Sequence, residues 1–204
     1  MRRFAFLLIL ATVQLFTGIR SLAGDYGNAA LQVNLERDRS EFVEPHFRAY
    51  VTMDSNQFGF RLPPGYRLTG DPASGILTLA NRQGNGSVTF SLANSLPEGV
   101  MDGAALGNSV SNQYPNAELV QQFTRNNATG SGPGFDLQWK VSGQLVQCKR
   151  VVYIISPAGV LEFTATAGRT NFPALQADLD YILTSLKCTT NGAKPKVSPI
   201  GDKS

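Results

Sequence analysis

The chain has 204 residues, of which 42% are hydrophobic and 16% are charged, and its formal net charge is +3. This length suits one domain with some chain left over, and the apolar fraction is too high for a disordered protein. The 20 glycines show no collagen-like period, which excludes a fibrous chain. An excess of positive charge favours a nucleic acid or an acidic membrane surface as partner only if the basic residues belong to the folded part of the chain.

The N-terminus has the pattern of an export signal. Two arginines precede an apolar run from Phe4 to Phe16, and small residues follow up to Ala23 and Gly24. This order is typical of a secretory signal peptide over residues 1–23, cleaved between Ala23 and Gly24. The apolar run is shorter than the roughly 20 residues that a membrane span needs. We therefore expect a secreted or periplasmic protein without stable membrane insertion once the signal is removed.

Cleavage changes what the charge implies. It removes three arginines and no acid, which leaves 15 basic and 15 acidic side chains. No basic stripe with interleaved aromatic residues remains, so nucleic-acid binding has no electrostatic footprint. We expect no nucleic-acid partner.

Residues 24–56 form a polar lead-in that we expect to be partly ordered at best. Leu31, Val33 and Leu35 alternate as in a short strand, and residues 47–53 have the composition of another. His46 is the only histidine and follows Glu41 and Glu44. A metal or acid–base site there is the less favoured interpretation, because a structural zinc needs more ligands than these.

Apolar periodicity predicts a compact α+β domain over residues 57–188. The Asn85-Gly86 pair favours a hairpin, and Asp102 and Asn171 are candidate N-caps of two helices. Strands joined mostly by turns predict an antiparallel sheet flanked by helices, not a parallel doubly wound sheet. Residues 189–204 lack periodicity and are expected to form a flexible C-terminal tail. The predicted strands are 58–62, 66–68, 76–80, 87–93, 117–125, 135–141, 146–156 and 160–168, and the predicted helices are 102–114 and 172–186.

The chain has two cysteines, Cys148 in the long strand pattern and Cys188 just after the last helix. In an exported protein such a pair predicts a disulfide, here one that would connect sheet and helix and contribute ~4 kcal/mol. Two buried free thiols are the alternative. A metal site is less favoured because no Cys-x-x-Cys element is present. No motif calls for a cofactor.

The sequence contains no convincing catalytic set. Asp178 and Asp180 point about 200° apart on a helix and do not form a carboxylate pair. Four aromatic residues are candidates for a ligand groove, although such residues more often pack in a core; they are Tyr66, Tyr114, Trp139 and Tyr153. Asn85 and Asn127 begin glycosylation acceptor patterns that matter only in a host that glycosylates exported proteins.

Three segments carry a resemblance to a known group of proteins. They are Gly59-Phe60-Arg61-Leu62-Pro63-Pro64-Gly65-Tyr66, the run from Gln147 to Thr166, and the closing helix from Leu175 to Leu186. Together they resemble the PsbP-like superfamily, which includes PsbP, Mog-type and DcrB-type proteins. The resemblance covers residues 57–188 and implies an αβα sandwich in a bacterial exported protein. It also implies a non-enzymatic accessory or binding role, with no catalytic residues to transfer.

We therefore expect a non-catalytic exported accessory or binding module that contacts an envelope or secreted protein. Two other interpretations stay open at the level of sequence. One is a small-molecule or lipid carrier with an apolar pocket under the helices. The other is a hydrolase with an unrecognised site.

Overall fold

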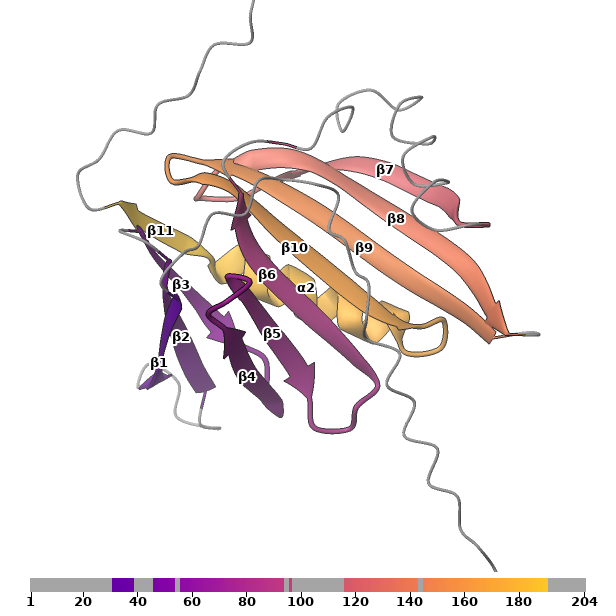
Figure 1. The fold of residues 1–204 in the computed structure, drawn as a ribbon, viewed down its shortest axis with the longest axis horizontal. Helices are drawn as coiled ribbons and strands as arrows, with labels where there is room; N and C mark the ends of the chain where they lie inside the picture. Colours follow the sequence, from indigo (N-terminus) through magenta and orange to yellow (C-terminus); the bar gives the residue numbers. More distant parts are fainter. Residues whose placement is uncertain are drawn as a thin grey trace, which may run out of the picture.

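The described part of the chain is built almost entirely from antiparallel strands (Figure 1). The computed structural model describes residues 31–38, 46–53, 56–93, 96, 116–142 and 145–190. The elements in chain order are β1 (Leu31–Asp38), β2 (His46–Met53), β3 (Asn56–Leu62), β4 (Tyr66–Asp71), β5 (Ile76–Asn81), β6 (Gly86–Ala93), β7 (Glu118–Asn126), β8 (Ser131–Ser142), β9 (Leu145–Ser156), β10 (Gly159–Gly168), α2 (Phe172–Ser185) and β11 (Lys187–Thr190).

The strands form two sheets. The four-stranded sheet has the order β1-β2-β3-β11, and the seven-stranded sheet has the order β4-β5-β6-β10-β9-β8-β7. Every neighbouring pair is antiparallel, as the short turn connections predict. In Figure 1 the four-stranded sheet lies at the left, and α2 lies behind the strands of the seven-stranded sheet.

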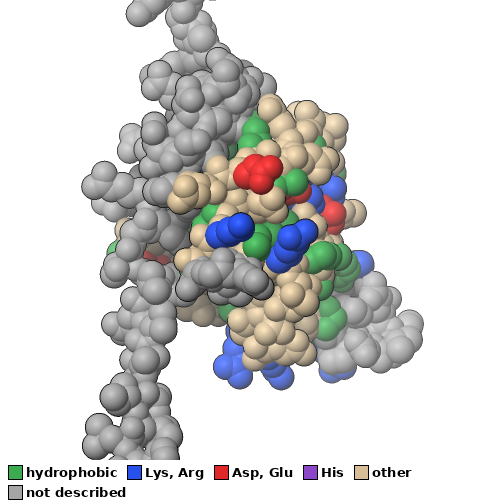
Figure 2. Space-filling view, turned by 90° about the vertical axis from the view of Figure 1, so that its right-hand side faces the viewer, with side chains coloured by type: hydrophobic (Ala, Val, Ile, Leu, Met, Phe, Trp, Pro, Cys, Tyr) green, Lys and Arg blue, Asp and Glu red, His purple; other side chains and the backbone are tan. Residues whose placement is uncertain are grey.

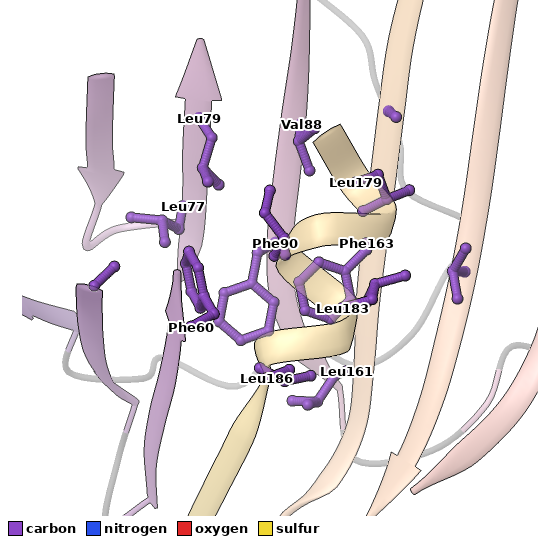
Figure 3. Packing of buried hydrophobic residues seen from close by; sticks show 14 of the residues in the cluster. Phe60, Leu77, Leu79, Val88, Phe90, Leu161, Phe163, Leu179, Leu183 and Leu186 are labelled. Atoms are coloured by element: carbon purple, nitrogen blue, oxygen red, sulfur yellow. The ribbon is translucent and has the colours of Figure 1, made fainter. Parts of the chain in front are cut away.

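One apolar cluster joins both sheets and the helix. Phe90 of β6 lies in it with its ring 4.8 Å from that of Phe163 and 5.5 Å from that of Phe58, measured between centroids. Phe60 of the four-stranded sheet meets the same ring edge-on at 6.2 Å. Figure 3 shows the rings of Phe60, Phe90 and Phe163 close together beside Leu179 and Leu183 of α2. All six side chains are fully buried, so this cluster is the main core of the described part.

Helix α2, predicted over residues 172–186, packs on this core through an apolar stripe. Phe172, Leu175, Leu179 and Ile182 are buried, and Pro173 stands in the first turn, where its missing N–H costs nothing. The predicted cap differs: Asn171 precedes the helix, but its side chain makes no capping hydrogen bond. Burial of the stripe therefore stabilises the helix more than its ends do.

A second apolar cluster lies on the other face of the seven-stranded sheet. Because side chains alternate along a strand, Val151 and Tyr153 of β9 point away from the face that carries Val152 and Ile154. The buried members of this second cluster are Ala93, Phe135, Leu137, Val151, Tyr153 and Val160.

The expected fold class is wrong. The described part is a mostly β structure with two antiparallel sheets and one helix, not an αβα sandwich with helices flanking one sheet. The strand patterns were sound, but a period of two shows only that a strand has a buried face and not which sheet it joins. Here β1, β2, β3 and β11 form a second sheet that covers part of the core in place of a helical layer.

Segments at both ends of the predicted domain form strands that belong to the four-stranded sheet. β1 and β2 belong to the polar lead-in 24–56, yet β2 pairs with β3 and its Ala49 and Val51 are fully buried. β11 was not predicted, and it pairs with β3 directly after α2. The signal segment 1–23, the predicted helix 102–114 and the end of the tail, residues 191–204, lie outside the described residues.

The hairpin between β5 and β6 forms, with a different turn residue. Gly84, with φ +71°, takes the left-handed conformation that was expected at Asn85-Gly86. Its N–H donates to the Asn81 carbonyl at 3.0 Å, and Gly86 already belongs to β6. A residue with a Cβ is disfavoured at Gly84 for this reason.

Replacing Phe90 with alanine should lower the free energy of unfolding by about 3–5 kcal/mol, because a cavity would open where both sheets and α2 meet. Urea unfolding followed by circular dichroism measures the change. The control is Val141→Ala in β8, where a side chain that is 53% exposed should contribute less than about 0.5 kcal/mol. Equal losses in both variants would contradict a shared core at Phe90.

Candidate functional site

Three of the four aromatic residues predicted to line a groove are described, and these three do not lie together. Trp139 and Tyr153 pack in the second cluster, on one face of the seven-stranded sheet. Tyr66 belongs to the first cluster, which includes the opposite face. Tyr114 lies outside the described residues. The structure thus brings Trp139 and Tyr153 to one side of the sheet and separates Tyr66 from them.

Tyr66 has a specific partner that the sequence did not indicate. Its ring is buried, and its hydroxyl donates to Oδ2 of Asp178 on α2 at 2.7 Å. Burial, and secondly the hydrogen bond and charge of Asp178, raise the pKa of Tyr66 well above its ordinary value near 10. The pair closes one side of a small hollow of about 100 Å³ between the β5–β6 turn and the start of α2. A volume this small suits a few water molecules and not a substrate.

The two helix aspartates act separately, as their spacing predicts. Asp178 accepts from Tyr66, whereas Oδ1 of Asp180 pairs with Nη1 of Arg125 in β7 at 3.1 Å. His46 begins β2, but its side chain, like Glu41 and Glu44, lies outside the described part. Within the described residues, no group of three or more histidine, cysteine, aspartate or glutamate side chains is placed to bind a metal.

Both cysteines are free thiols in the structure, so the predicted disulfide is not formed there. Cys148 of β9 belongs to the first cluster, and Cys188 of β11 packs against that same cluster from the other sheet. Burial raises the pKa of both thiols, which disfavours the reactive thiolate at neutral pH. The pair therefore links the sheets by packing, and a covalent link stays a prediction.

A buried ion pair anchors α2 at the far end of the seven-stranded sheet. Asp136 of β8 faces Arg150 of β9, and the two side chains make two hydrogen bonds of 2.7 Å. Gln176 of α2 donates to the same carboxylate at 3.2 Å, and the guanidinium lies 4.8 Å from the centre of the Phe123 ring. These groups satisfy one another, so we interpret the network as structural.

Gly134 explains why Phe123 can reach this network. A Cβ at position 134 would collide with the Phe123 ring, so only glycine lets the ring lie against β8. The predicted strand starts only at residue 135, but β8 begins at Ser131. Phe123 and Arg150 were missed as neighbours because the sequence does not show which residues of two strands stand opposite each other.

The β7–β8 turn joins the sheet to the end of α2. The Asn127 amide donates to the Leu183 carbonyl at 3.1 Å, and the Thr129 hydroxyl donates to the Leu186 carbonyl at 2.9 Å. Asn127 also accepts the N–H groups of Thr129 and Gly130. The side chain that was a candidate glycosylation acceptor therefore serves as a structural link.

β1 is one of four edge strands in the described part, and the others are β11, β4 and β7. β1 pairs with β2 on one side, and no described strand pairs with its other side. Val33 and Leu35 of β1 and Phe47 of β2 are 39%, 47% and 42% exposed, on the face that carries the buried Ala49 and Val51. We call the unpaired side of β1 together with Val33, Leu35 and Phe47 the open edge.

The opposite face of the four-stranded sheet is polar. A hollow of about 410 Å³ lies there, lined by Gln32, Val33, Asn34, Glu36, Tyr50, Thr52 and Gln57. The Tyr50 ring lies over Gly59 of the next strand, where a Cβ would stand 3.3 Å from the ring. β1 thus presents apolar side chains on one face and polar side chains on the other.

Charge by itself marks no site on the face shown in Figure 2. The described basic, acidic and apolar side chains are mixed there, without a surface of a single sign. Within the described part, α2 falls short of the length and apolarity that a membrane-spanning helix requires.

The chain matches no protein-family model and no curated protein. Its structure is similar to a cyanobacterial PsbP (CyanoP) from Synechocystis, at 12% identity and a TM-score of 0.47, covering 84% of this chain and 100% of that one. LpqN of Mycobacterium tuberculosis, involved in cell envelope biogenesis, matches at 13% identity and a TM-score of 0.44, covering 78% and 91%. The protein of unknown function PA94 of Pseudomonas aeruginosa matches at 16% identity and a TM-score of 0.39, covering 73% and 92%.

These similarities concern the fold. One of the matched structures, the cyanobacterial PsbP, bears the name of the superfamily that the sequence resembles. At such identities no function transfers to this chain.

Tyr66 provides a test of the contact between β4 and α2. Because its pKa is raised in the folded state, its contribution to stability is complete below about pH 10 and is lost as the pH rises further. The wild-type protein should therefore lose about 2 kcal/mol relative to Tyr66→Phe by about pH 11.5. Urea unfolding at a series of pH values measures this difference. Asp178→Asn should reduce the loss without abolishing it, because burial is the largest cause; an unchanged difference from pH 9 to 11.5 would contradict a buried hydroxyl.

The state of the cysteines is tested by mass. The exported protein should gain two hydrogens on reduction if the predicted bridge between Cys148 and Cys188 forms. Without reductant, denatured protein should then resist alkylation at both residues. Recovery of two alkylated cysteines under those conditions would show that the native protein keeps the free thiols of the structure.

Proposed function

We propose that this chain is an exported, non-catalytic binding module that contacts an envelope or secreted protein through the open edge. The observation that carries the proposal is that β1 combines exposed apolar side chains with an edge that no described strand pairs with. The export pattern at residues 1–23 supports the proposed compartment.

An unpaired edge is a binding element for an extended segment. Successive backbone N–H and C=O groups along one side of β1 are available to another strand, which can add to the sheet by β-augmentation. Each backbone hydrogen bond contributes about 1 kcal/mol net. Eight residues of β1 offer enough pairing for a partner strand of ordinary length.

The exposed apolar side chains would add to the stability of the complex and determine which face of β1 the partner covers. Val33, Leu35 and Phe47 are each roughly half exposed, so covering them would stabilise a complex by about 1 kcal/mol per side chain. They lie on one face only, while Asn34 and Glu36 lie on the other. The partner that fits is an extended segment with apolar residues at every second position facing Val33 and Leu35.

Substitution of Leu35 with glutamate should abolish capture of the partner from an envelope fraction, because the complex would bury a charge without a counter-ion. The measurement is affinity capture with wild-type protein, Leu35→Glu and Val141→Glu, quantified for each recovered species. Val141 is the matched control, since it is 53% exposed in β8 of the other sheet.

The expected result is a species recovered equally by wild type and Val141→Glu and at least about tenfold less by Leu35→Glu. Equal recovery by all three proteins would refute the open edge as the contact. Sedimentation of the purified protein shows whether two copies of this chain associate. A dimer that is lost in Leu35→Glu would mean that the open edge binds a second copy of this chain and not a different protein.

A further inference from the structure

A separate hollow lies at the C-terminal end of α2, and its charged residues are all basic. Its volume is about 320 Å³. Arg48 of β2, Arg61 of β3 and Lys187 of β11 line it, and no aspartate or glutamate does. The remaining lining residues are Ala128, Tyr181, Thr184, Ser185 and Leu186. We call this feature the basic hollow.

The strand register places like charges side by side. Arg48 stands directly opposite Arg61 in the β2–β3 pair, an arrangement that destabilises a sheet. Lys187 pairs with Gly59, two residues from Arg61 on the same face of the sheet. Three neighbouring strands thus bring one cation each to the same hollow.

The helix end does not require these cations. The Ser185 hydroxyl donates to the Ile182 carbonyl at 3.0 Å, and Asn127 and Thr129 donate to the carbonyls of Leu183 and Leu186. Neutral donors therefore already satisfy these carbonyls. The negative end of a helix dipole amounts to about half a charge, which three formal positive charges outweigh.

A described carboxylate on this face, that of Glu36, belongs to the adjoining hollow. Glu36 stands opposite Arg48 on the side away from Arg61, and its Oε1 accepts from the Asn34 amide at 3.4 Å. Arg48 and Arg61 also make other contacts. A guanidinium has five N–H donors, and we expect each arginine to keep at least one of them for a ligand.

We propose that the basic hollow binds a phosphate group. A tetrahedral phosphate accepts hydrogen bonds in several directions and carries up to two negative charges, which matches cations arriving from three strands. A single planar carboxylate would be satisfied by two hydrogen bonds from one guanidinium. The other cations of the hollow would then still repel one another. The shared chemistry belongs to inorganic phosphate and to a phospholipid headgroup alike.

Titration of the purified protein with inorganic phosphate at constant ionic strength tests the proposal. Backbone amide shifts of residues 185–188, followed by NMR, should change and saturate. Arg61→Gln and Lys187→Gln should each weaken phosphate binding about tenfold or more, because each removes a charge-assisted hydrogen bond. The matched control is Arg67→Gln, an exposed strand arginine outside the hollow, which should leave the affinity unchanged.

Vesicles of phosphatidylglycerol, compared with phosphatidylcholine, distinguish the two sources. Cosedimentation with the anionic vesicles that is lost in Arg61→Gln and Lys187→Gln would assign a headgroup, and phosphate binding without vesicle binding would assign a free phosphate. Lys187 is exposed, so its variant retains the fold and keeps the test decisive. Absence of saturable phosphate or vesicle binding, or equal affinity in wild type, Lys187→Gln and Arg67→Gln, would overturn the proposal.

Discussion

The packing around Phe90 is the contact on which the rest of the described structure depends. Its ring stacks on Phe163 of its own sheet and meets Phe58 and Phe60 of the four-stranded sheet at steep angles. Figure 3 shows Phe60, Phe90 and Phe163 with α2 beside them. Because the four-stranded sheet turns one face to this cluster, its other face and the unpaired side of β1 are left at the surface. Both proposed contact regions, the open edge and the basic hollow, belong to this sheet, so the core that buries one face creates them.

The width of the seven-stranded sheet explains why polar groups, and not only apolar ones, connect it to α2. Seven strands at about 4.8 Å spacing span about 29 Å, whereas a helix is only about 10–12 Å wide. Helix α2 contacts β10, β6, β9 and β3, and the four-stranded sheet shares the rest of the first cluster. Toward β7 and β8 the helix is held by the ion pair of Asp136 and Arg150 instead of by apolar contacts. Gln176 of α2 donates to this pair, and the Phe123 ring lies against the guanidinium. Removing either ionic partner alone would leave a buried charge, so the pair makes the position of α2 specific.

Some features could be predicted because they depend on neighbours in the chain. The alternation of Val88, Phe90 and Leu92 and the stripe of Leu175, Leu179 and Ile182 indicate which faces are buried. The structure buries these side chains, Leu92 only in part. The roles of Arg48, Arg61 and Asp136 could not be predicted in this way. Arg48 meets Arg61 through the β2–β3 register, and Asp136 meets Arg150 through the β8–β9 register. A shift of either register by one residue would place these side chains on opposite faces.

The sequence by itself determined the strand faces, the apolar stripe of α2 and the turns between antiparallel strands, because each follows from a period of a few residues. It also contains the export pattern at residues 1–23. Only the tertiary structure decided that β1, β2, β3 and β11 leave the large sheet and form a second one. The physical reason is that one helix is too narrow to cover the apolar face of the large sheet. Any other element with an apolar face can cover the remaining part. Which element does so, and which cations and edges remain outside, depends on contacts between residues far apart in the chain.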